Sequence, residues 1–346
     1  PIKPVIEVDP LSDEEVEMAR TVEVLDEGPI PTPYIDWSRI PPHAIPPTSE
    51  EVDYVDYPVP GAPEGMLKAL RELFRRNRKY GHKSPVNVLI IGPPGTGKSQ
   101  LVKKFAAEAG LPYWQVMGRE GITSAELLGS FHLEKGGGTV WKEGIIPKAV
   151  RMGGVLHIDE ANVIDPAILM RLDELLDSKR QLNLYDETGE IIKAHPDLFI
   201  IFTLNPPEFE GVKPLPPPIM SRLQKRFHLD YPDERVELKI VEHMLRKYAG
   251  ITPEQFEVPD DPKQPVKGTL AKEIQDFYDA VKRLRANDEI QTKPTMRELI
   301  GFAIDLAEGD DWNTAFWTNL GNVYTGEEKG TVSIALKDLL QLRRGG

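Results

Sequence analysis

The sequence predicts an α/β fold with a parallel sheet, followed by a smaller helical domain. Short apolar segments rich in β-branched residues alternate with helical patterns from about residue 86 to residue 230, and this alternation is typical of a parallel sheet. From Pro232 onward the strand patterns stop while helical periodicity continues. A chain of 346 residues is long for one domain. We therefore expect an acidic, proline-rich arm at 1–63, an α/β core at 64–231 and a helical lid domain at 232–346.

The composition excludes several classes of protein. Hydrophobic residues make up 40% of the chain, but no run approaches the roughly 18 apolar residues of a membrane helix, so no membrane insertion is expected. The N-terminal region is acidic and rich in proline, unlike a signal peptide, which favours a cytoplasmic protein. Cysteine is absent, which excludes disulfides, thiolate metal sites and a cysteine nucleophile.

The negative charge is concentrated in the arm. Residues 1–60 contain 14 acidic and 3 basic side chains, while the rest of the chain is close to neutral. A nearly neutral body argues against nucleic acid as the main ligand.

Two interpretations of the arm remain open. Thirteen of the 32 prolines lie in residues 1–63, a density that excludes regular helix and favours extended chain. The arm is either a solvated tail or a strap along the body or a neighbouring subunit. Apolar residues such as Tyr34, Trp37 and Tyr54 favour the strap.

The core begins with an amphipathic helix at 64–80, which has an apolar stripe and a basic stripe. Further strands are predicted at 86–91, 111–117, 155–158, 198–203 and 226–230. A capping box at Thr123 and Glu126 starts a short helix, and Asp165-Pro166 starts another. Two hairpins are expected, one at 131–141 around Gly136-Gly137-Gly138 and one at 181–193 around 186–189. Helices of the C-terminal domain are predicted at 233–249, 269–286, 294–307 and 332–343.

A glycine-rich loop connects the strand at 86–91 to a helix. It reads GPPGTGKS and fits the pattern of Gly, four residues and Gly-Lys-Ser that cradles phosphates. Backbone N–H groups and the positive end of the helix dipole would surround a phosphate. Lys98 would reach the β and γ phosphates, and the Ser99 hydroxyl would bind Mg²⁺. The residues predicted to bind nucleotide are Gly92, Pro93, Pro94, Gly95, Thr96, Gly97, Lys98, Ser99 and Gln100.

Polar residues follow two of the predicted strands. Asp159 and Glu160 end an apolar strand, where one carboxylate would join the Mg²⁺ shell and the other would polarise water. Asn205 follows the fourth strand, where its amide could hold the attacking water or contact the γ phosphate. His157 is predicted to be a buried core side chain with satisfied hydrogen bonds. Either Arg222 or Arg226 could stabilise charge as an arginine finger.

These motifs resemble those of a known family. GPPGTGKS, VLHIDE at 155–160, FTLNPP at 202–207 and MSRL at 220–223 are similar to the motifs of AAA+ ATPases, in particular the MoxR and dynein-related group, over about residues 64–305. The resemblance implies a P-loop fold with a five-stranded sheet, in which the Asn205 strand lies between the Lys98 and Asp159 strands. It also implies two inserted hairpins, a helical lid, and a homo-oligomeric ring, usually a hexamer, with ATP at subunit interfaces.

The resemblance also assigns the remaining catalytic residues. Arg222 stands ten residues before Pro232, the spacing of the finger arginine in MoxR-like chains, and Arg226 is the alternative. Arg297, in the segment PTMR, resembles the second sensor near the γ phosphate, in its own site or a neighbour's. The predicted catalytic set is Glu160, Asn205, Arg222 and Arg297.

The expected function is an ATP-hydrolysing ring motor or chaperone that remodels or activates a protein partner, which in relatives often carries a von Willebrand A domain. One alternative is a nucleic-acid-associated motor or loader, supported only by the basic stripe Lys68, Arg71, Arg75 and Lys79. This stripe is otherwise a solvated face, or contacts the arm or a neighbour's nucleotide. Another alternative is a nucleotide-gated scaffold with negligible turnover, against which Glu160 argues.

Overall fold

The computed structural model describes residues 34–81, 83–206 and 214–344, which form two compact units. The first unit consists of the described residues up to Pro93 together with Gly97–Asp230, and the second of Pro94–Thr96 and the chain from Tyr231 onward. Each unit has a hydrophobic core of its own. Within the described ranges, no helix is both long and apolar enough to cross a bilayer.

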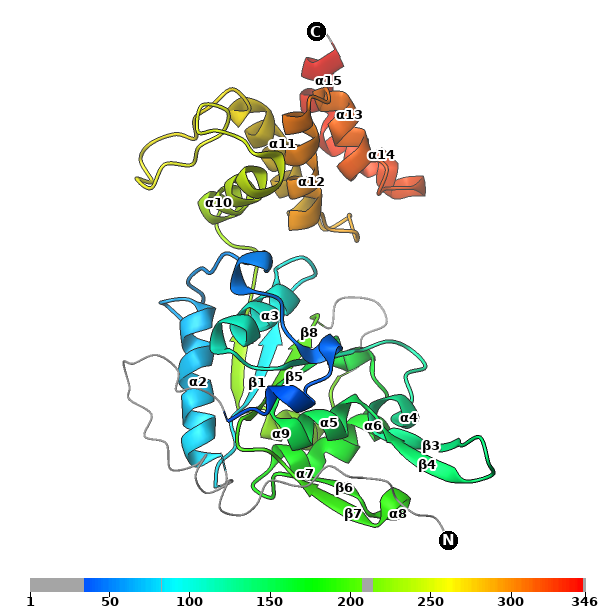
Figure 1. Ribbon diagram of the computed structural model, residues 1–346. Helices are drawn as coiled ribbons and strands as arrows, with labels where there is room; N and C mark the ends of the chain where they lie inside the picture. Colours follow the sequence, from blue (N-terminus) through cyan, green and yellow to red (C-terminus); the bar gives the residue numbers. More distant parts are fainter. Residues whose placement is uncertain (1–33, 82, 207–213, 345–346) are drawn as a thin grey trace. The chain divides into compact units, whose positions relative to one another are not determined.

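The first unit is built on five parallel strands in the order β2-β5-β8-β1-β9. The three central strands, β5, β8 and β1, are labelled in Figure 1. Every residue of β5 and of β8 is buried, which explains why these strands are mostly apolar in sequence. The implied position of the Asn205 strand is confirmed, because β8 pairs with β1 on one side and β5 on the other. The strands are β1 (Asn87–Ile91), β2 (Tyr113–Met117), β5 (Gly154–Asp159), β8 (Leu198–Leu204) and β9 (Lys225–His228).

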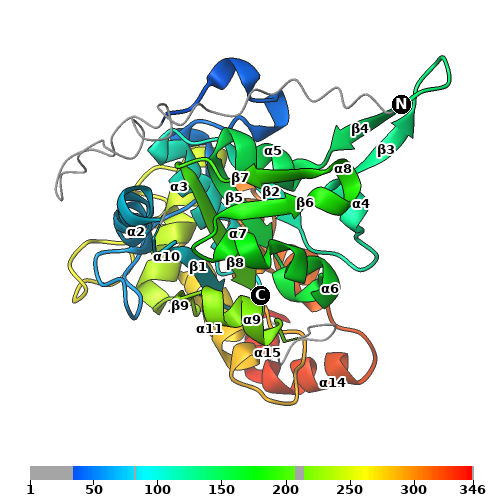
Figure 2. The same cartoon turned by 90° about the horizontal axis from the view of Figure 1, so that it is seen from below.

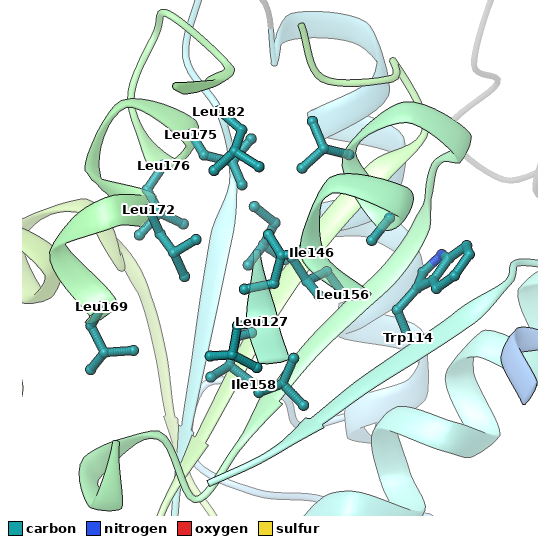
Figure 3. Close-up of a cluster of buried hydrophobic side chains, with 14 of the residues drawn as sticks. Trp114, Leu127, Ile146, Leu156, Ile158, Leu169, Leu172, Leu175, Leu176 and Leu182 are labelled. Atoms are coloured by element: carbon teal, nitrogen blue, oxygen red, sulfur yellow. The ribbon is translucent and has the colours of Figure 1, made fainter. Parts of the chain in front are cut away.

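Helices cover the sheet. Helices α2 (Met66–Tyr80) and α3 (Lys98–Ala109) lie together on one side (Figure 2), where Phe74, Phe105 and Phe199 form edge-to-face contacts with centroids 5.7–6.2 Å apart. Elsewhere, hydrophobic side chains from several elements, most of them aliphatic, form a large buried cluster (Figure 3). The other helices of this unit are α4 (Ser124–Leu127), α5 (Ile145–Met152), α6 (Pro166–Leu169), α7 (Asp173–Leu176), α8 (Tyr185–Thr188) and α9 (Pro217–Arg222), with short 3₁₀ turns at Trp37–Arg39, Pro42–Ala44, Ser49–Glu51, Ala161–Val163 and Met170–Leu172.

Both predicted hairpins are confirmed. Strand β3 (Gly129–Leu133) pairs antiparallel with β4 (Thr139–Glu143), and β6 (Gln181–Leu184) pairs with β7 (Glu190–Lys193). The connection of the second hairpin is the single helical turn α8, which is capped at its C-terminal end by Gly189.

Residues 34–62, which we call the strap, lie along the first unit. Ile40 and Ala44 join its core, and the ring of His43 contacts that of Trp114 edge to face at 6.2 Å. Lys104 Nζ donates a hydrogen bond to the Ser49 carbonyl oxygen at 2.5 Å. The strap is therefore partly built into the hydrophobic core. The first 33 residues of the predicted arm lie outside the described residues.

The start of the strap is anchored at a buried polar cluster. The Tyr34 N–H donates to Asp197 Oδ2 at 2.7 Å, and the Tyr34 ring stacks on His195. The Asp197 carboxylate also lies 2.9 Å from Arg78 Nε, and both side chains are buried. His195 Nδ1 accepts the Asp197 N–H at 3.0 Å, so this imidazole is held in its neutral form.

This anchor predicts acid sensitivity. Burial, assisted by the charges of Arg78 and Arg180, lowers the pKa of His195 to about 4. In the unfolded chain a histidine has a pKa near 6.5, so on acidification the unfolded state binds a proton at a higher pH than the folded state does. The free energy of unfolding should therefore fall as the pH drops from about 6.5 to about 4, by up to about 1.4 kcal/mol per pH unit for one proton. Urea unfolding at several pH values measures this dependence.

The control for this prediction is a second histidine. Burial raises the pKa of Asp197, and this shift favours the folded state on acidification, so the comparison must be made between variants. His195→Gln should flatten the pH dependence, whereas His228→Gln, at an exposed position of β9, should not. Equal slopes in the wild type and His195→Gln would contradict the prediction.

The second unit is helical, as predicted, but two elements differ. The region predicted as one helix at 332–343 forms two helices, α14 and α15, and the first of them begins before residue 332. The sequence did not reveal this earlier start because α14 buries only Val332 and so has no apolar stripe. Helix α13 was not predicted, although Asp311 caps its first N–H groups. The helices are α10 (Glu234–Met244), α11 (Ala271–Arg285), α12 (Met296–Glu308), α13 (Trp312–Phe316), α14 (Gly326–Ala335) and α15 (Lys337–Arg344), with π-helical turns at Leu245–Ala249 and Trp317–Gly321.

Candidate nucleotide-binding site

The glycine loop joins the end of β1 to the start of α3. Gly97, the residue before α3, has φ 84°, a left-handed conformation that side chains disfavour. Gly92 directly follows β1 and lies against the segment after β9, where a Cβ atom on Gly92 would be 2.0 Å from the Leu229 carbonyl oxygen. Both glycines are therefore required by the backbone path of the loop.

Lys98 lies at the centre of the site. Its side chain is buried, and Nζ donates to the carbonyl oxygens of Gly92 at 2.6 Å and Pro93 at 2.8 Å, and to Asn205 Oδ1 at 3.1 Å. Asn162 Nδ2 in turn donates to the Asn205 carbonyl oxygen at 2.9 Å. Because β8 lies next to β1, the fold brings Lys98 and Asn205 together although they are 107 residues apart.

The Asp159 carboxylate is the second centre. Oδ2 accepts hydrogen bonds from Ser99 Oγ at 2.7 Å and Gln115 Nε2 at 3.0 Å, and Oδ1 accepts one from Thr203 Oγ1 at 2.5 Å. Burial acts to raise the pKa of Asp159, but the neighbouring His157 and these hydrogen bonds together lower it. Asp159 is therefore an ionised acceptor in contact with Ser99.

This pair fits magnesium. Mg²⁺ prefers oxygen ligands and is usually held by one or two protein oxygens together with substrate phosphates and water. The Ser99 hydroxyl and the Asp159 carboxylate provide two such oxygens side by side. The donor set therefore suits an ion that reaches the site with phosphate.

Glu160 has an unusual backbone. It adopts φ 49° and ψ 42°, a left-handed conformation that is rare outside glycine. Its N–H donates to Asp159 Oδ1 at 3.1 Å. Such a conformation costs on the order of 1–3 kcal/mol and is typically retained at functional sites. Its effect is a sharp turn directly after the strand that carries Asp159.

The arginines are bound elsewhere in their units. Arg222, at the end of α9, lies with Nη1 2.9 Å from Asp173 Oδ1 and with Nη2 3.8 Å from Asp177 Oδ2. Arg226 donates to two backbone carbonyl oxygens of the segment before it. Arg297 is an exposed residue of α12 in the second unit. None of the hydrogen bonds described for these three side chains leads to Lys98 or Asp159.

Sequence reasoning missed three polar residues of this site. Gln115 and Thr203 bind Asp159, and Asn162 holds the backbone of Asn205. Gln115 and Thr203 are polar residues within otherwise apolar strands, and this was the available signal. Both side chains reach Asp159 only because of the relative register of β2, β5 and β8, and the sequence of a single strand does not reveal that register.

Comparison with known proteins agrees with this geometry. Residues 87–223 match the protein family described as AAA domain (dynein-related subfamily). The chain is 34% identical to CbbQ of Hydrogenophilus thermoluteolus over 172 residues, which are 50% of this chain and 62% of CbbQ. It is 34% identical to NorQ of Paracoccus denitrificans over 154 residues, 44% of this chain and 56% of NorQ. BssE of Thauera aromatica is 29% identical over 255 residues, 72% of this chain and 79% of BssE. The chain thus spans less than two thirds of the length of CbbQ and NorQ.

Proposed function

We propose that this chain is an AAA+ protein of the MoxR and dynein-related group, and that it hydrolyses ATP with Mg²⁺ and uses the hydrolysis to remodel or activate a protein partner. The match of residues 87–223 to the AAA domain model and the likeness to CbbQ support the first part of this proposal. The observation that carries this proposal is that the consecutive residues Lys98 and Ser99 bind Asn205 and Asp159, respectively, through hydrogen bonds of their side chains. Phosphoryl transfer requires a cation at the phosphates, oxygen ligands for Mg²⁺ and a polar group that orients the attacking water. The Lys98 ammonium, the Ser99 and Asp159 oxygens and the Asn205 amide provide these groups.

The proposed reaction assigns a role to each group. Lys98 and the loop N–H groups bind the β and γ phosphates, and Ser99 and Asp159 hold Mg²⁺, which neutralises phosphate charge when bound. Asn205 orients a water molecule. The water oxygen forms a bond to the γ phosphorus as the bond to the β–γ bridging oxygen breaks, ADP leaves, and Glu160 accepts the proton of the water.

We place the proposed site at the interface of a homo-oligomeric ring, of hexameric type, in which Arg222 completes the site of a neighbouring subunit. Arg222 stabilises the charge that develops on the γ phosphate. Arg226 is its alternative, and Arg297 contacts the γ phosphate of its own or a neighbouring site. The domain limits of this proposal are 1–63, 64–231 and 232–346.

The proposed partner is a protein, with a von Willebrand A domain protein as the first candidate. A nucleic-acid partner is disfavoured by the basic stripe of α2 itself. Lys68 pairs with Glu64, and Arg71 pairs with Glu108 at 2.5 Å. Lys68 and Arg71 thus have acidic partners within the unit, which reduces their attraction for phosphates.

Affinity capture with a variant that binds ATP but does not hydrolyse it tests whether the protein has a specific protein partner. Tagged Glu160→Gln should hold ATP and retain its partner, so affinity capture from an extract of the encoding organism with ATP and Mg²⁺ should recover a specific protein. Tagged Lys98→Ala, which should not hold ATP, is the matched control. Recovery of the same proteins by both baits would contradict a nucleotide-dependent partner.

A further inference from the structure

A chain of buried hydrogen bonds crosses three adjacent strands beside the Asp159 carboxylate. His157 lies in β5 and is fully buried. Its Nδ1 atom lies 2.8 Å from the hydroxyl of Tyr113 in β2, and its Nε2 atom lies 2.9 Å from Thr203 Oγ1 in β8. Thr203 Oγ1 is in turn 2.5 Å from Asp159 Oδ1. The chain therefore runs from Tyr113 through His157 and Thr203 to Asp159.

The carboxylate determines the direction of every bond in this chain. An ionised Asp159 can only accept, so the single hydroxyl hydrogen of Thr203 must be donated to it. The Thr203 oxygen is then the acceptor for the Nε2–H of His157. The Nδ1 atom of the neutral imidazole has no hydrogen and accepts from the Tyr113 hydroxyl. One proton arrangement thus satisfies all four groups.

The surroundings support this arrangement. His157 is fully buried, and each of its ring nitrogens has one partner in this chain of hydrogen bonds. Burial raises the pKa of Tyr113, which keeps its hydroxyl protonated. Polar groups at this depth are stabilising only when all of them are bonded, and a complete network of this kind makes its members rigid.

We propose that Tyr113, His157 and Thr203 are positioning residues that hold the Asp159 carboxylate in the orientation required for Mg²⁺. Asp159 Oδ1 is fixed by Thr203, which leaves Oδ2 directed at Ser99. Partners behind a metal ligand commonly fix its orientation in this way, and their loss typically weakens metal affinity by about 10–100-fold. This inference rests on the proposed function, because it assumes that Asp159 binds magnesium.

The test separates magnesium binding from nucleotide binding. Binding of a fluorescent ATP analogue is measured in EDTA and across a Mg²⁺ titration, for the wild type, His157→Phe and His157→Gln. His157→Phe should raise the Mg²⁺ concentration for half-maximal effect by about 10-fold or more and leave affinity in EDTA unchanged. His157→Gln keeps one donor and one acceptor and should restore most of the loss.

Two further variants guard against a purely structural effect. Ile158→Val trims a buried side chain in the same strand without touching the chain of hydrogen bonds and should not shift the Mg²⁺ titration. Tyr113→Phe removes only the terminal hydroxyl and should shift it in the same direction as His157→Phe but by less. It remains informative if His157→Phe fails to fold.

The outcomes distinguish the two levels of proposal. This inference alone would be overturned if the wild type binds nucleotide with Mg²⁺ and the His157 and Tyr113 variants show the same Mg²⁺ titration as the wild type. Equal losses of affinity with and without Mg²⁺ would also overturn it, because they would indicate a structural role. A wild type without magnesium-dependent nucleotide binding would overturn the proposed function and this inference with it.

Discussion

Arg222→Ala should leave ATP binding nearly unchanged and lower turnover by about 10³–10⁵-fold, the effect expected when a finger arginine is lost. The reason is that a transferring γ phosphate spreads negative charge over its oxygens, and a cation placed there stabilises the transition state more than the bound substrate. Steady-state ATP hydrolysis, together with binding of a fluorescent ATP analogue, measures the two quantities separately.

Mixed rings test whether Arg222 acts on a neighbour. Lys98→Ala subunits should lack a working site of their own but still provide Arg222. Mixed with Arg222→Ala subunits, they would create interfaces where an intact Lys98 faces an intact Arg222, and activity should partly return. No recovery, with mixed rings shown to form, would favour Arg226 or a finger within the same subunit.

The ion pair of Arg222 provides a control for structural damage. Arg222 Nη1 lies 2.9 Å from Asp173 Oδ1 of its own chain, so Arg222→Ala also removes an intramolecular contact. Asp173→Asn removes that ion pair and keeps the arginine. We expect Asp173→Asn to retain most of the turnover. A loss as large as that of Arg222→Ala would show that the contact, rather than the arginine at the phosphate, accounts for the effect.

Lys98→Ala and Glu160→Gln should separate ATP binding from hydrolysis. Without Lys98, a bound triphosphate loses its main countercharge, so tight binding should be lost. Glu160→Gln should still bind ATP but turn over at least about 10²-fold more slowly, because the general base is lost. Glu120→Gln, at an exposed position, is the matched acid-to-amide control and should behave like the wild type. Normal turnover by Glu160→Gln would remove Glu160 from the mechanism.

Features with a local cause could be predicted from the sequence. The loop between β1 and α3 was predictable because glycine and the following lysine occupy fixed places in one short segment. Both hairpins were predictable from their turn residues. The order of the strands came from the family resemblance, because apolar strands such as β5 and β8 carry no information about which strand lies beside which.

Features that depend on strand register could not be predicted. His157 was correctly expected to be buried and satisfied, but its partners Tyr113 and Thr203 lie 44 and 46 residues away, on different strands. Their contact exists only because β2, β5 and β8 are neighbours. Helix α13 was missed for a different reason, since its cap and apolar spacing were visible in the sequence and were not recognised.

The strap has a consequence for how the chain is made on a ribosome. The Tyr34 N–H binds Asp197, a residue 163 positions later, so the start of the strap leaves the ribosome well before its binding partner has been synthesised. At typical translation rates this interval is roughly 10 to 30 s. During that time Ile40 and the other apolar residues of the strap have no finished core to enter. The nascent chain would therefore expose these apolar residues until the rest of the unit has been made, and chaperones that bind emerging chains could bind them during that time.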